Sequence, residues 1–403
     1  MKSPLIALLL MSFTVQTFAD DWTQWRGPNR EGRSTEKGLL ESWPEGGPSL
    51  SWKATGFGVG YSSVVIADGR IFTMGDRDGA SCVIAVSEKT GKPIWVSKIG
   101  EDGGHKRYKG TRSTPTVDGN DVVALNQHGD IACLDARNGS IKWNVNVREK
   151  FAGRMMSGWR YSESPLIDGS KVVCTPGGSE GAVVALDRKT GKKLWETSTW
   201  TDFAAYSSVI IAAIHGKRQY VQLTGKSVAG IDPDTGKILW KAERAGKTAV
   251  IATPIVHNNR VFVTSSYGVG CAGFEIAKDG SVKELFKNKS LSNHHGGVVR
   301  IGDHVYGATG GTFRCVDMRT GEQVWNERSV GKGATVYVDG KFILRSENGP
   351  VALIEASPEG YQEVSKFKQP ERTREKAWPH PVVANGRLYL RDQDTLLCFN
   401  VSK

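Results

Sequence analysis

The chain has 403 residues, of which 48 are glycine and 24% are charged, and its net charge at neutral pH is +11. Abundant glycine with few charged residues is typical of turn-rich all-β proteins, and no stretch has the periodicity of a long helix. The sequence contains no zinc-finger, RNP or helix-turn-helix pattern, which argues against a nucleic-acid-binding protein. We attribute the basic charge mainly to solvated lysines in turns, with a polyanion-binding surface as the alternative.

Residues 1–19 have the features of a secretory signal. Lys2 is followed by an apolar stretch, and the small residues Thr17 and Ala19 precede a cleavage site before Asp20. The apolar stretch is too short for a membrane span, and no cysteine follows it to carry a lipid anchor. We expect a periplasmic or secreted monomer without a membrane span, in which residues 20–48 form an extension that packs on a main domain, residues 49–403.

The main domain contains a repeated motif that ends in tryptophan. Clear copies such as "VIAVSEKTGKPIWVS" and "VVALDRKTGKKLWET" recur at intervals of 45 to 52 residues, and weaker copies lie around Gly280 and Gly360. A period in the forties with short strands indicates the blades of a β-propeller. We expect the tryptophans to dock on the neighbouring blade, because their large rings can cover its edge. These structural residues are Trp52, Trp95, Trp143, Trp195, Trp240 and Trp325.

Each copy is preceded by a β-hairpin pattern such as "SSVVIADGRIFTM", in which alternating apolar residues flank a tight turn. One repeat therefore predicts four antiparallel strands. Within the motif, Asp187 can bond the turn backbone and Gly191 can adopt the positive φ that closes the turn.

Eight hairpin starts predict eight blades, and the last blade lacks its fourth strand. The chain ends soon after Cys398, whereas "LSWKA" around Trp52 resembles an outer strand with no third strand before it. We expect the N-terminal strand to complete the last blade, because a closed ring leaves no free sheet edge. The predicted fold is an all-β, eight-bladed propeller of four-stranded antiparallel blades.

The six cysteines are predicted to be buried free thiols. Cys133, Cys315 and Cys398 occupy the same small-residue position in different blades. Packed sheets lie about 10 Å apart, which exceeds the reach of a disulfide.

A ligand site is expected in the loops that depart from the repeat, at 100–112, 146–163, 288–297 and 368–381. These loops join the outer strand of one blade to the inner strand of the next, and they should emerge together around the central channel. Their arginine and aromatic residues suit an anionic or extended ligand, although solvated loops with packing aromatics are the alternative. The ligand-binding candidates are Arg107, Tyr108, Lys109, Arg112, Arg154, Trp159, Arg160, Tyr161, His294, His295, Arg372, Arg374, Trp378 and His380.

No catalytic or metal-binding residues are predicted. His294 and His295 are adjacent, but no carboxylate or cysteine stands at ligand spacing from them. Serine, histidine and aspartate are too scattered to nominate a hydrolase triad.

The repeated Ala-x-Asp-x-x-Thr-Gly-Lys-x-x-Trp pattern resembles the tryptophan-docking motif of the PQQ-type (pyrroloquinoline quinone) β-propellers. That superfamily contains quinoprotein alcohol dehydrogenases and non-catalytic members such as the outer-membrane-assembly protein BamB. The opening "DWTQWRGPNREGRSTEKGLLESWPEGGPSLSW" is similar to the start of a group of secreted bacterial PQQ-repeat proteins. The resemblance covers essentially the whole mature chain and implies the fold rather than one function.

The chain departs from both branches of that superfamily. The dehydrogenases usually have adjacent cysteines over the cofactor, carboxylate and amide ligands for calcium, and an aspartate base, and this sequence lacks an adjacent cysteine pair and an evident calcium set. The BamB branch has a lipid-anchoring cysteine that is absent here.

Three functions remain open from the sequence. The first is a non-catalytic binding or scaffold module for a protein or an anionic envelope polymer, with no cofactor. The alternative is a PQQ-dependent oxidoreductase that acts on an alcohol or sugar, with PQQ and calcium at the channel mouth. Trp159 with Arg160 or Arg112 would then contact the quinone, and Glu101, Asp102, Glu149 and Glu163 would be the nearby carboxylates. A carbohydrate-active enzyme is a third possibility.

Overall fold

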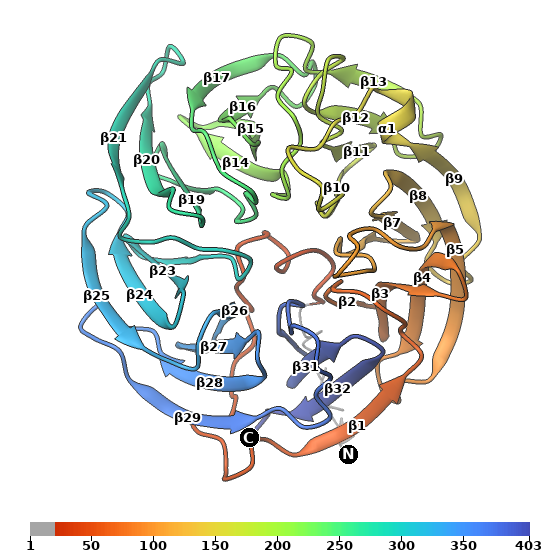
Figure 1. The fold of residues 1–403 in the computed structure, drawn as a ribbon, viewed down its shortest axis with the longest axis vertical. Helices are drawn as coiled ribbons and strands as arrows, with labels where there is room; N and C mark the ends of the chain where they lie inside the picture. The colour runs from red at the N-terminus through yellow and green to blue at the C-terminus, as the bar shows by residue number, and fades with distance from the viewer. Residues whose placement is uncertain (1–20) are drawn as a thin grey trace, which may run out of the picture.

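Short apolar strands separated by tight turns fold into eight four-stranded antiparallel sheets, arranged as the blades of a closed ring (Figure 1). The computed structural model describes residues 21–403, so the expected signal sequence lies outside the described residues. The eight-bladed propeller predicted from the repeats is confirmed. Its innermost strands line the central channel, and its outermost strands form the rim.

Each of blades one to seven is built from four consecutive strands. Blades one to three are β2 (Val65–Ala67), β3 (Arg70–Arg77), β4 (Ala80–Ser87), β5 (Pro93–Glu101); β6 (Thr116–Asp118), β7 (Asp121–Leu125), β8 (Asp130–Asp135), β9 (Ile141–Asn146); and β10 (Leu166–Asp168), β11 (Lys171–Cys174), β12 (Val184–Asp187), β13 (Lys193–Glu196). A single helical turn, α1 (Val147–Lys150), follows β9.

Blades four to seven continue in the same order. They are β14 (Ile210–Ile214), β15 (Lys217–Leu223), β16 (Ser227–Ile231), β17 (Ile238–Glu243); β18 (Ile255–His257), β19 (Arg260–Ser265), β20 (Gly270–Ile276), β21 (Val282–Asn288); β22 (Val299–Ile301), β23 (His304–Thr309), β24 (Thr312–Asp317), β25 (Gln323–Arg328); and β26 (Gly333–Val338), β27 (Lys341–Ser346), β28 (Pro350–Glu355), β29 (Glu363–Lys368).

Blade eight closes the ring with strands from both ends of the described chain. Its inner strands are β30 (Val382–Ala384), β31 (Arg387–Asp392) and β32 (Thr395–Asn400), and its outer strand is β1 (Leu50–Thr55). Trp52 of β1 lies opposite Cys398 of β32 in an antiparallel pair. The predicted closure by the N-terminal strand is therefore confirmed.

The middle strands of each blade are buried on both faces, which explains their continuous apolar sequences. In β12 the residues Val184, Ala185 and Leu186 are almost fully buried, whereas in β13 only Trp195 is buried among exposed neighbours. All six cysteines are buried with free thiols. No helix among the described residues could cross a membrane.

Most of the motif tryptophans contact the next blade. Five of them donate their indole N–H to a carbonyl oxygen in the motif turn of that blade, at 2.7–3.1 Å; the pairs are Trp52 with Glu88, Trp95 with Ala136, Trp143 with Arg188, Trp195 with Pro233, and Trp325 with Ser357. Trp240 instead bonds Gln219 Oε1 of its own blade at 2.6 Å. The exception coincides with the degraded motif of blade five, which follows Trp240.

Residues 21–34 lie in the middle of the ring, where Figure 1 shows them in red between the inner strands, and the chain then leads out to the rim, where β1 begins. Trp22 bridges Ile66 of β2, and Arg33 bridges Tyr337 of β26. Residues 22–33 therefore occupy the channel that the blades surround.

Candidate ligand-binding site

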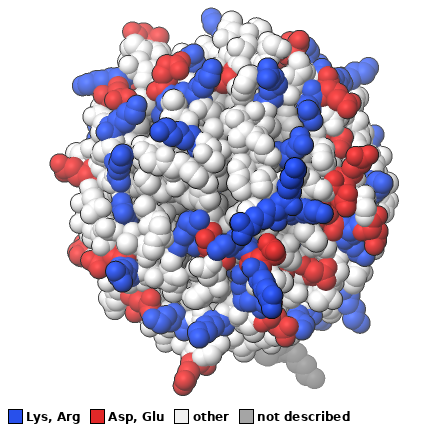
Figure 2. Space-filling model, viewed as in Figure 1, with Lys and Arg blue, Asp and Glu red and all other residues white. Residues whose placement is uncertain are grey.

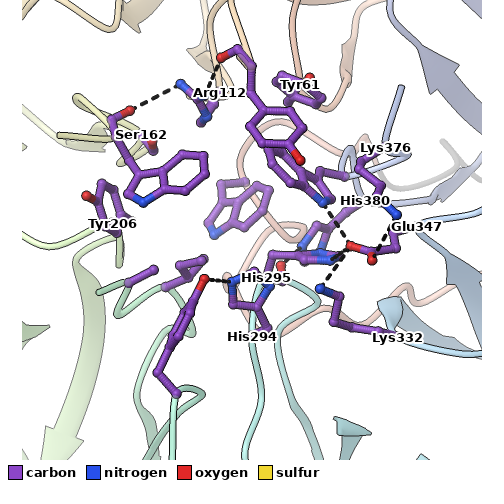
Figure 3. Close-up of a pocket in the computed structure, with 17 residues that line it drawn as sticks. Tyr61, Arg112, Ser162, Tyr206, His294, His295, Lys332, Glu347, Lys376 and His380 are labelled. Carbon is purple, nitrogen blue, oxygen red and sulfur yellow. Dashed lines mark hydrogen bonds and ion pairs between the residues drawn. The ribbon is translucent and has the colours of Figure 1, made fainter. Parts of the chain in front are cut away.

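A cavity of about 260 Å³ opens on the ring axis, at the face where the outer strand of each blade connects to the inner strand of the next. We call this face the loop face. The cavity is lined by Trp25, Tyr61, Tyr108, Arg112, Trp159, Ser162, Tyr206, Ala249, Ile251, Tyr267, His294, His295, Lys332, Glu347, Lys376, Trp378 and His380. Figure 3 shows side chains from many blades pointing toward this common space.

Aromatic rings form most of the cavity wall. The Trp378 ring centroid lies 4.6 Å from that of Tyr61, 4.8 Å from that of Tyr108 and 6.4 Å from that of Trp159. His105 stacks on the outer side of the cluster, 4.1 Å from Trp159 and nearly parallel to it. These mutual contacts fix the rings before any ligand arrives, which lowers the entropy cost of binding.

The segment in the channel supplies the floor of the cavity. The ring of Trp25 lies 4.4 Å from that of His380. Two buried arginines hold this segment: Arg26 donates to the carbonyl oxygens of Glu31 and Val298, and Arg30 donates to those of Ser164, Pro165 and Val209. The carbonyls of Ser164, Val209 and Val298 come from blades three, four and six, so the arginines tie the floor to the surrounding ring.

Arg112 is a positive charge on the cavity wall without an acidic partner among residues 21–403. Its guanidinium donates to the carbonyl oxygens of Trp159 and Tyr108. It also lies 5.6 Å from the ring centre of Tyr61 and 5.9 Å from that of Trp159. Burial lowers the pKa of Arg112, yet an arginine stays charged at neutral pH.

The opposite wall holds one carboxylate surrounded by donors. Glu347 accepts from His295 Nε2 and Trp378 Nε1 at 3.1 Å, and its oxygens lie 3.1 Å from Lys332 Nζ and 3.4 Å from Lys376 Nζ. Burial alone would raise the pKa of Glu347, but the contacts with His295, Trp378 and Lys332 hold it well below its usual value. This carboxylate is ionised and fully engaged at neutral pH.

The three histidines of the cavity are neutral at neutral pH. Burial, with the nearby His295 and Lys332, lowers the pKa of His294 to about 3. Burial also lowers the pKa values of His295 and His380. The lining therefore has three cations, Arg112, Lys332 and Lys376, against one anion, and its excess charge is positive.

Seven of the fourteen ligand-binding candidates from the sequence line this cavity: Tyr108, Arg112, Trp159, His294, His295, Trp378 and His380. Arg107, Lys109 and Arg374 are exposed outside it. Arg372 is 2.5 Å from Asp392 in an ion pair. The remaining candidates lie around a separate cavity of about 220 Å³, where Tyr161 is buried and bonds the carbonyl of Pro176; they are Arg154, Arg160 and Tyr161.

Several lining residues escaped the sequence analysis. Tyr267 and Glu347 lie in turns between the second and third strands of their blades, which end on the same face as the loops that were considered. Lys332 lies in an interblade loop without a distinctive motif, and Lys376 lies in the nominated loop 368–381 but was not among its candidates. Trp25 lies in the N-terminal extension, whose three tryptophans were the available signal.

The residues of the cavity could contact the quinone of PQQ, but they do not provide the ligands for its calcium ion. Trp159 with Arg112 offers a ring and a cation, but the only carboxylate of the cavity is already engaged by two lysines. Glu101 and Asp102 are exposed outside the cavity, and Glu163 is buried against Thr175 and Gln222. Within residues 21–403 no group of three or more His, Cys, Asp or Glu side chains could hold a metal ion. The donor set does not fit calcium.

A protein family described as outer membrane protein assembly factor BamB matches residues 79–327 of this chain. The BamB protein of Burkholderia pseudomallei is 29% identical over 197 residues, which are 47% of this chain and 49% of that protein. The chain thus matches about half the length of such curated relatives.

Two solved structures show the same fold. BamB from Moraxella catarrhalis has a TM-score of 0.62 at 18% identity, covering 87% of this chain and 97% of that chain. Quinohemoprotein alcohol dehydrogenase from Comamonas testosteroni has a TM-score of 0.63 at 13% identity, covering 95% of this chain and 81% of that chain. At such identities the likeness concerns the fold and not the function.

Proposed function

This chain belongs to the PQQ-repeat family described as outer membrane protein assembly factor BamB, and from that premise we propose that it is a non-catalytic scaffold that binds a protein partner at its loop face. The family and the curated relatives named as assembly factors support a binding role. The residues 1–19 support a place in the periplasm, reached by secretion.

The protonation states of the polar groups in the cavity are the observation that supports this proposal. Glu347 is ionised and engaged by four donors, and His294, His295 and His380 are neutral. General acid–base chemistry uses a group that gains and loses a proton near the working pH, and the pKa values of Glu347, His294 and His380 lie far below that range. The aromatic rings of the cavity, of which Trp159 and Trp378 are partly exposed, offer in contrast the kind of surface on which interface energy concentrates.

The test is site-specific photo-crosslinking in the native cell. A photoreactive residue is placed at Lys109 or Arg374 near the cavity, and in a control at Lys189, in the turn between β12 and β13 on the opposite face. We expect a discrete protein adduct from the two loop-face positions, its loss when Trp378→Ala is added, and no adduct from Lys189. Adducts that form equally well from Lys189, or persist fully with Trp378→Ala, would contradict docking at this cavity.

A PQQ-dependent oxidoreductase is the second candidate, favoured by one observation: Arg112 lies 5.9 Å from the Trp159 ring on the cavity wall. Titration of the purified protein with PQQ and calcium, followed by absorbance and a dye-linked alcohol assay, separates the two functions. We expect no stoichiometric uptake and no substrate-dependent dye reduction. Uptake with turnover would replace the scaffold by a dehydrogenase.

A further inference from the structure

Resting on the proposed function, we infer that the loop-face cavity receives an aromatic side chain of the partner, and that acidic residues flanking that side chain contact cations in and around the cavity. The partner would thus present an acidic segment with an aromatic anchor. Size, ring geometry and charge each support this chemistry.

The cavity has the size of one large side chain. Its volume of about 260 Å³ lies below the roughly 300–1,000 Å³ of pockets that enclose a whole small-molecule ligand. Trp25 closes its lower end against His380, so a ligand enters from the loop face and does not pass through the ring. A side chain at the tip of a partner segment meets these limits.

The rings of the wall are arranged to hold another ring. Trp159 and Trp378 stand 6.4 Å apart at an interplanar angle of 71°, and Tyr61 and Tyr108 complete the wall on the same side. Aromatic side chains prefer such tilted or edge-to-face neighbours. Large aromatic anchors in pockets also dominate the affinity of many protein interfaces.

The charge of the cavity selects for carboxylates. Arg112 has two carbonyl partners and no acidic partner among the described residues. Lys332 and Lys376 share a single carboxylate, that of Glu347. Uncompensated cations in a partly buried site favour an anionic ligand, because an added carboxylate pairs with charge that is already desolvated.

Further cations outside the cavity also favour a ligand with carboxylates. Arg107, Lys109 and Arg374 are exposed in the loops that contribute Tyr108 and Trp378, and none of them has an ion pair within residues 21–403. Figure 2 shows Lys and Arg side chains reaching across the middle of the face in view, with a few acidic side chains beside them. A ligand confined to the cavity could not reach these loops, whereas an extended acidic segment could. Their charges would raise the association rate and its dependence on salt.

Fluorescence anisotropy with labelled seven-residue peptides tests the inference. The probe has a central tryptophan with three glutamates on each side; one control replaces the glutamates by lysines, and another replaces the tryptophan by alanine. We expect the probe to bind, the lysine control not to bind, and the alanine control to bind at least about tenfold more weakly. Equal binding of the lysine or alanine control would overturn the inference.

Variants locate the site. Trp378→Ala should weaken binding of the probe about tenfold, and the exposed pair Arg107→Ala with Arg374→Ala should weaken it and reduce its salt dependence. The pair Lys189→Ala with Lys192→Ala removes the same charge from the opposite face and should leave binding unchanged. Since the four exposed positions do not contribute to the core, these two double variants remain informative if Trp378→Ala fails to fold.

Competition by alginate, a polyanion without aromatic rings, tests whether an anionic polymer occupies the cavity instead of an aromatic side chain. If alginate competes as strongly as the tryptophan peptide, the occupant is an anionic polymer and the inference is wrong. If no peptide binds while the loop-face crosslinks form, the scaffold function stands and the partner chemistry is wrong. If no peptide binds and no loop-face crosslinks form, the proposed function is wrong as well.

Discussion

At the scale of single residues, the repeated motif is explained by contact between tryptophan and glycine of successive blades. Gly236 has a φ of +73°, and a Cβ added there would lie 2.6 Å from a ring carbon of Trp195 in the preceding blade. The same turn accepts the indole N–H of Trp195 at the carbonyl of Pro233. The glycine therefore serves the turn and also leaves room for the ring.

Gly236→Ala should destabilise the protein by about 2–4 kcal/mol, because the new methyl group collides with Trp195 in addition to straining the backbone. Gly216 is a matched control, since it also has a φ of +73° but nothing within 4 Å of an added Cβ. Gly216→Ala should cost only about 1 kcal/mol from backbone strain. Denaturant unfolding of both variants measures this, and equal losses would refute the ring contact as the reason for glycine.

Glu163 should make stability depend on pH. Burial raises its pKa to about 7, although Thr175 and Arg30 favour the ionised form. A carboxyl group with a raised folded-state pKa binds its proton more tightly when folded, so its contribution falls as pH rises from about 4.5 to 7. Relative to the native chain, Glu163→Gln should gain stability over that range, by up to about 3 kcal/mol. Paired melting curves at pH 5 and pH 8 measure the gain; a pH-independent difference would contradict it.

At the scale of elements, the N-terminal segment completes the cavity that the blades surround. Arg30 is fully buried and donates to carbonyls of blades three and four, and Arg26 reaches blade six. Since Trp25 directly precedes Arg26, these bonds place the floor of the cavity. The ligand site therefore depends on an element outside the repeats.

Arg30→Ala should release the segment, because three carbonyl oxygens lose their donor in a buried setting. We expect a loss of about 2–4 kcal/mol in the free energy of unfolding, and faster proteolysis of residues 21–34 than of the blades. Limited proteolysis with mass spectrometry reads both effects. Lys37→Ala is the control, since Lys37 is exposed and its ion pair with Asp339 lies at the surface. An Arg30→Ala protein that resists proteolysis like this control would show that the arginine does not hold the segment.

At the scale of the whole molecule, β1 closes the ring. It pairs with β32 along Leu50–Thr55, and Trp52 donates to Glu88 of blade one, so it joins the last blade to the first. A protein that begins at residue 56 would expose the edge of β32. We expect oligomers or aggregates of that truncated protein, because an unpaired edge strand recruits other chains. Size-exclusion chromatography checks this, and a stable monomer would contradict closure by β1.

The repeats made the fold predictable, since Trp195 and its counterparts mark each outer strand and Trp52 marks the one that closes the ring. The site was predictable only in part, because a linear pattern does not show which ends of different blades meet. Trp159 and Trp378 stood in unusual loops, whereas Tyr267 and Glu347 stand in short turns that look like any other hairpin. Trp25 reaches the cavity through the channel, a path that no local pattern encodes.

A crystal structure of the protein with the acidic tryptophan peptide tests the central claim most directly. The account predicts the indole of the peptide in the cavity, packed against Trp159 and Trp378, with a peptide carboxylate on Arg112 and the backbone leading out over Arg107 and Arg374. A peptide bound on another face, or an indole outside the cavity with the glutamates alone in contact, would contradict it.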